Sequence, residues 1–105
     1  MTQTISTDWN SSIKGYRTFL ELERGLSKNS IAAYTRDIQQ FAEYLATEEK
    51  VGNPGLITIT NIESFMGSLF DRDLARNSQA RMLSGIRSYC KYLRKEKILL
   101  DDPVE

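Results

Sequence analysis

Residues 26–32 read Leu-Ser-Lys-Asn-Ser-Ile-Ala and residues 74–80 read Leu-Ala-Arg-Asn-Ser-Gln-Ala, so one pattern occurs twice, 48 positions apart. Asn and Ser favour helix starts, and the unpaired N–H groups of a helix start attract anions such as phosphate. Apolar residues repeat at the same offset: Ile38 and Ile86, Phe41 and Tyr89, Tyr44 and Tyr92, Leu45 and Leu93. The repeat predicts two helices that begin with the same basic and amide chemistry, although ordinary helix-start preferences alone could also produce it.

Apolar residues spaced three and four positions apart predict four helices, at about 8–24, 28–49, 61–72 and 76–97. Gly25 is expected to end the first helix and Ser27 to cap the second. Thr60 with Glu63 is expected to form a capping box at the start of the third. A chain of 105 residues makes one domain. The predicted fold class is therefore all-α, a compact four-helix bundle over 1–105, with 98–105 beginning a linker.

Several kinds of chemistry have no residues to support them. The sequence contains no His, one Cys and no glycine-rich phosphate loop, so we expect no catalysis by this chain alone, no metal site and no cofactor. Cys90 lies on an apolar stripe and is expected to be a buried, inert thiol in a reducing cytoplasm. No apolar run is long enough to cross a membrane, and residues 1–8 do not resemble a signal peptide.

The formal net charge is zero, but the charges are unevenly distributed. A helical wheel of 76–97 places Leu83, Ile86, Cys90 and Leu93 on one side. The other side carries cations, hydroxyls and an amide without any carboxylate: Asn77, Arg81, Ser84, Ser88, Lys91 and Lys95. Arg and Asn suit base edges, Ser suits phosphate or bases, and the small Gly85 would let this helix lie deep in a DNA groove. An idle basic surface is the alternative.

The side chains on the outer side of the helix at 28–49 are also short, neutral or cationic. It carries Asn29, Ala32, Ala33, Arg36 and Gln40. Two helices with matching outer sides and matching starts favour a nucleic-acid surface over an idle one.

Residues 25–38 and 76–89 resemble the second-helix and fourth-helix signatures of the tyrosine recombinase (phage integrase) family. The resemblance is to the N-terminal core-binding, SAM-like domain, and to Xer-type recombinases in particular. It spans about residues 9–103, and Asp102-Pro103 stands where Asn-Pro is usual in the family.

The resemblance implies a DNA-binding domain that forms half of a clamp around duplex DNA, with its second and fourth helices facing the major groove. In the family the catalytic residues belong to a second domain, so none of the five tyrosines here is the expected nucleophile. The implied partners are double-stranded DNA and, for the full-length protein, other recombinase subunits in a tetrameric synapse. The alternative is a SAM-like protein-interaction adaptor that does not bind DNA.

The residues predicted to contact DNA lie in and behind the two copies of the repeated pattern. They are Ser27, Lys28, Asn29, Ser30, Arg36, Arg76, Asn77, Ser78, Arg81, Ser84, Arg87, Ser88 and Lys91.

Overall fold

The computed structural model describes residues 7–101 and residue 103, and within them it contains helices and no strand. The elements are α1 (Thr7–Leu22), α2 (Lys28–Glu48), the short 3-10 helix η1 (Pro54–Leu56), α3 (Ile59–Asp71) and α4 (Arg76–Lys95). The all-α prediction is confirmed, and each α-helix begins and ends no more than two residues from its expected bounds.

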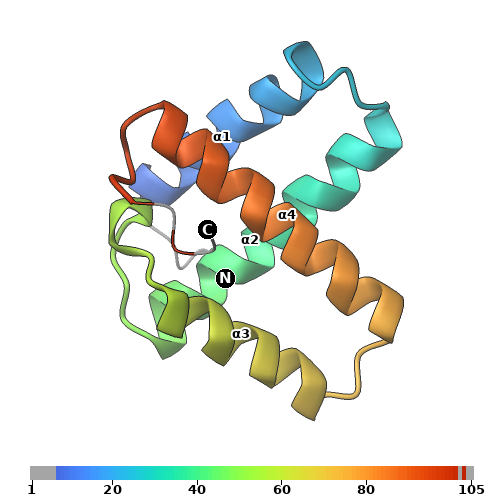
Figure 1. Ribbon diagram of the computed structural model, residues 1–105, viewed down its shortest axis with the longest axis vertical. Coiled ribbons are helices and arrows are strands. Elements are labelled where there is room, and N and C mark those ends of the chain that lie inside the picture. The colour runs from blue at the N-terminus through green and yellow to red at the C-terminus, as the bar shows by residue number, and fades with distance from the viewer. Residues whose placement is uncertain (1–6, 102, 104–105) are drawn as a thin grey trace.

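The fold is organised around the crossing of α2 and α4 (Figure 1). These two helices diverge from the crossing toward their N-terminal ends, while α1 and α3 pack on either side of them. Their apolar faces share one core with those of α1 and α3, built largely from fully buried aromatic and aliphatic side chains such as Tyr16, Phe41, Phe65 and Tyr89. Trp9 anchors α1 because its ring is buried and its Nε1–H donates to the Val51 carbonyl at 3.2 Å.

The start of α3 differs from the prediction. The cap is Thr58 and not Thr60: its Oγ1 accepts from the Asn61 N–H at 3.2 Å, and Asn61 Oδ1 accepts from the Thr58 N–H at 2.9 Å. Asn61 also donates to Glu49 at the end of α2, at 3.2 Å. The buried Asn61 side chain thus caps α3 and also bonds to the end of α2. Because Thr58 and Asn61 form the capping box, the helix begins two residues earlier than expected.

The repeat seen in the sequence extends to the turns around α2 and α4. Gly25 and Asp73, 48 positions apart, both have φ of 60° and lie between the end of one helix and the start of the next. After α2, the Val51 N–H donates to the Leu45 carbonyl at 2.9 Å; after α4, the Leu99 N–H donates to the Leu93 carbonyl at 3.2 Å. Leu99 is 4% exposed, so a residue from the expected linker packs into the core.

Candidate nucleic-acid interface

Most of the residues predicted to contact DNA lie on the surface. In α2 and its cap, Ser27, Lys28, Asn29 and Arg36 are exposed and Ser30 is half-buried. In α4, Arg76, Asn77, Arg81, Ser84, Arg87 and Lys91 are exposed, whereas Ser78 and Ser88 are half-buried. The structure does not gather the two helix starts into one site, because they lie at opposite ends of one side of the molecule (Figure 1).

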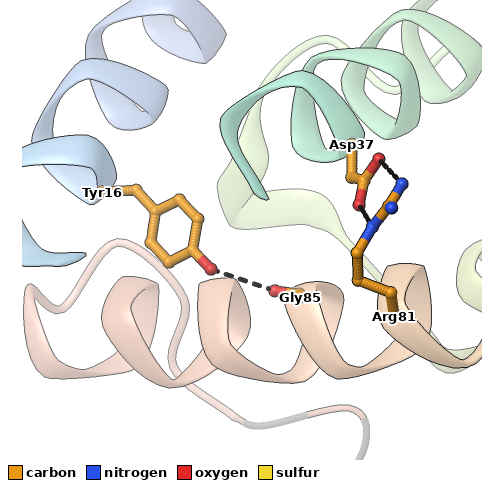
Figure 2. A network of polar contacts seen from close by, with 4 residues as sticks. All are labelled: Tyr16, Asp37, Arg81 and Gly85. Atoms are coloured by element: carbon orange, nitrogen blue, oxygen red, sulfur yellow. Dashed lines mark hydrogen bonds and ion pairs between the residues drawn. The ribbon is translucent and has the colours of Figure 1, made fainter. Parts of the chain in front are cut away.

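Arg81, one of the predicted DNA contacts, pairs with a carboxylate of another helix. Its Nε–H donates to Asp37 Oδ2 at 2.7 Å and its Nη2–H donates to Asp37 Oδ1 at 2.9 Å, in a two-bond pair between α4 and α2 (Figure 2). The Asp37 side chain is 4% exposed and that of Arg81 is 42% exposed. The hydrogen bonds to Asp37 raise the pKa of the Arg81 guanidinium. Arg81 therefore fixes the crossing of α2 and α4.

The carboxylate-free face predicted for α4 thus receives a carboxylate from another helix. The signal was present in the sequence, because Asp37 lies next to Ile38 on the apolar side of α2. An acid on a buried stripe requires a cation or several hydrogen-bond donors. A wheel of α4 alone cannot show this partner.

Lys95, on the same face of α4, is also paired. Its Nζ donates to both carboxylate oxygens of Glu23, at 2.8 and 2.7 Å, and lies 5.5 Å from the centre of the Phe19 ring. This pair is exposed on both sides and contributes at most about 1 kcal/mol. It nevertheless removes one cation from the surface that a phosphate could use.

Gly85 has a different role from the predicted one. It is buried and faces the inside of the molecule, where an added Cβ would lie 3.1 Å from the Tyr34 ring. Its carbonyl accepts a hydrogen bond from the Tyr16 hydroxyl at 3.4 Å (Figure 2). The absent side chain lets α4 approach α2 at this position.

Four tyrosines belong to the packing of the bundle. Burial raises the pKa of Tyr16 to about 12, and it also raises the pKa values of Tyr44, Tyr89 and Tyr92. Ser12 Oγ donates to the Trp9 carbonyl at 2.8 Å, so the Tyr89 hydroxyl, 2.5 Å from Ser12 Oγ, is the donor of that second bond. Burial thus favours the neutral form of these phenols. Cys90 is buried as predicted.

The cations that remain available define a basic surface on α4 and the first half of α2. Within residues 7–101 and 103, no ion pair joins a carboxylate to any of its members: Lys28, Arg36, Arg76, Arg87 and Lys91. Seryl hydroxyls and Asn77 lie between these cations on α4. Exposed cations among short hydrogen-bonding side chains can neutralise phosphates along a backbone.

The described part of the chain contains no group of His, Cys, Asp or Glu side chains that could hold a metal ion. In the same residues, no helix combines the length and the apolar character needed to cross a membrane.

An all-α domain with a basic face fits the comparisons with known proteins. Residues 13–97 match the family model of the phage integrase N-terminal SAM-like domain, so the chain belongs to that family. The tyrosine recombinase XerD of Staphylococcus haemolyticus is 36% identical over 91 residues, which cover 87% of this chain and 30% of that protein. XerD of Staphylococcus epidermidis is 35% identical over 94 residues, covering 90% of this chain and 32% of that protein. The chain spans about a third of the length of these relatives. No solved structure matches it significantly.

Proposed function

We propose that this chain is the DNA-binding N-terminal domain of a site-specific tyrosine recombinase. The observation that carries the proposal is the basic surface of α4, where Arg76, Arg87 and Lys91 have no carboxylate partner among the described residues. The family membership and the XerD relatives support the recombinase context. The domain clamps duplex DNA through α2 and α4, and the breaking and rejoining of strands belongs to a catalytic domain elsewhere in the full-length protein.

The full-length protein acts with other recombinase subunits on DNA, in a tetrameric synapse located in the cytoplasm. Within this domain, Arg81 contributes by holding α4 against α2 through Asp37. Its guanidinium keeps donors outside that pair, because only Nε and Nη2 bond to Asp37. The principal phosphate contacts are Arg36, Arg76, Arg87 and Lys91.

The test is a titration of the chain with labelled duplex DNA at several salt concentrations. The double variant that carries Arg87→Gln and Lys91→Gln should bind duplex DNA at least tenfold more weakly. It should also lower the slope of log K against log salt by roughly 2, because about one counterion is released per phosphate contact. The control is Lys14→Gln with Arg17→Gln, which removes the same charge from exposed positions of α1.

Equal losses in both double variants would mean that only net charge matters and that the α4 surface is not the interface. Complete absence of DNA binding by the unmodified chain and by the full-length protein would favour the alternative, a SAM-like protein-interaction adaptor. Amide NMR shifts on adding duplex should concentrate at 27–36 and 76–91 if the proposal is correct.

A further inference from the structure

A small cavity opens between the end of α1 and the middle of α4, and we call it the Arg24 cavity. Its volume is about 260 Å³. Its lining residues are Phe19, Arg24, Ser84, Arg87, Ser88 and Lys91. Three cations and two hydroxyls therefore surround one space beside an aromatic ring.

Arg24 joins the cavity from the turn after α1, far from α4 in the sequence. Its Nη1–H donates to Ser88 Oγ at 3.4 Å, which holds the guanidinium beside the α4 surface. Arg24 was absent from the sequence-predicted contacts because it precedes the repeated pattern and belongs to neither predicted interface helix. Only the packing of α1 against α4 brings it to Arg87 and Lys91.

The charges around the Arg24 cavity favour an anion. None of its lining residues is acidic. The adjacent Glu23 directs both carboxylate oxygens to Lys95, at 2.8 and 2.7 Å. The three cations around the cavity repel one another. An anion that enters the cavity relieves this repulsion and is attracted by all three cations. Arg guanidinium groups suit phosphate because they donate two parallel hydrogen bonds to its oxygens, and seryl hydroxyls can donate a further one.

We propose that the Arg24 cavity binds one phosphate of the DNA backbone, and that Arg24 is a DNA contact supplied by the α1–α2 turn. The phosphate lies between Arg24 on one side and Arg87 and Lys91 on the other, with Ser84 and Ser88 as additional donors. The identity of the ligand as a DNA phosphate rests on the proposed function, whereas the affinity of the cavity for phosphate does not.

The test compares the unmodified 105-residue chain with Arg24→Gln and with a matched control, Arg17→Gln. Arg17 is exposed and lies on the opposite side of α1 from Phe19, since two helical positions apart correspond to a rotation of roughly 200°. Each variant removes one positive charge from the surface. Thermal unfolding checks that both variants are folded.

The first measurement is a titration with inorganic phosphate at constant ionic strength, followed by amide NMR. Saturable shifts at residue 24 and at 84–91 are expected in the unmodified chain and in Arg17→Gln, with at least a tenfold weaker response in Arg24→Gln. Shifts that are absent, or equal in all three proteins, would overturn the proposal even if the chain binds DNA elsewhere.

The second measurement is the salt dependence of binding to duplex DNA. Arg24→Gln should lower the slope of log K against log salt by about 1, and Arg17→Gln should leave it unchanged. Equal slopes for all three proteins would overturn the assignment of Arg24 as a DNA contact. An Arg24-dependent phosphate response without DNA binding by the unmodified chain would support a phosphate site and contradict the proposed function.

Discussion

The first turns of α2 and α4 carry the same basic, amide and hydroxyl residues, but their caps differ. The Ser27 side chain accepts from the Ser30 N–H at 3.2 Å, whereas the equivalent residue before α4 is Ala75, which makes no side-chain cap. The helices also differ at their crossing. Asp37 in α2 and Gly85 in α4 stand 48 positions apart; one accepts the bonds of Arg81, and the other makes room for Tyr34.

The comparison shows how two copies of one helix pattern fit against each other. Two identical faces would bring like groups together at the crossing. Here a carboxylate on α2 meets a guanidinium on α4, and a tyrosine ring on α2 meets a glycine on α4. The outer sides are similar, whereas the inner sides are complementary. The predictions below test that division, from the largest expected effect to the smallest.

Arg81→Ala should lower the free energy of unfolding by about 2–4 kcal/mol, because it leaves the Asp37 carboxylate buried without its cation. Arg36→Ala removes an exposed cation from the outer side of α2 and should change stability by no more than about 0.5 kcal/mol. Urea unfolding measures both. Equal effects would show that Arg81 is a surface residue like Arg36 and that the crossing does not depend on it.

Raising the pH should destabilise the side of the core that contains Tyr16 and Tyr89. The pKa of Tyr16 is raised from 10.0 to about 12, so its contribution to stability is fully present below pH 10 and is lost as the pH rises through about 12. A shift of about 2 units corresponds to a loss of about 2–3 kcal/mol. Urea unfolding as a function of pH, with tyrosinate absorbance recorded in parallel, measures this. Ionisation of all tyrosines near pH 10 without loss of stability would contradict the packing described here.

Tyr89→Phe makes position 89 identical to its counterpart in α2, Phe41. The change removes the hydroxyl that donates to Ser12 and should cost about 1–1.5 kcal/mol, since the Ser12 oxygen loses a buried partner while the ring stays in place. Ser12→Ala, which also removes the hydrogen bond to the Trp9 carbonyl, is the comparison. Unfolding midpoints in urea measure both changes. A Tyr89→Phe variant as stable as the unmodified chain would mean that the two helices differ here without energetic consequence.

Exchanging the caps tests the difference at the helix starts. Ser27→Ala should destabilise the chain by about 1 kcal/mol, whereas Ala75→Ser should stabilise it by about 0.5–1 kcal/mol. Hydrogen exchange of the first-turn amides of α2 and α4, together with thermal unfolding, separates the two ends. If both substitutions changed stability in the same direction, the missing side-chain cap at α4 would not explain the difference between the two helix starts.

The exposure of most candidate DNA contacts could be predicted from sequence because exposure follows helical periodicity. Arg87 and Lys91 are exposed as the pattern indicates, and Ile86 and Leu93 are buried. The role of Arg81 was missed because its partner lies on another helix, 44 positions away. The proximity of Arg24 to Ser88 could not be predicted for the same reason, since it results from the packing of α1 against α4.

The sequence by itself determined the four helices, their bounds to within two residues, and the family. These properties depend on residue spacing and on local preferences for helix starts and ends, which a linear pattern contains. Only the tertiary structure decided that Asp37 engages Arg81, that Gly85 accommodates Tyr34, and that Asn61 bonds to Glu49. Each of these depends on a contact between elements that a single-helix pattern does not specify. The same distinction separates the α4 cations that pair with carboxylates, Arg81 and Lys95, from Arg76, Arg87 and Lys91, which have no carboxylate partner among the described residues.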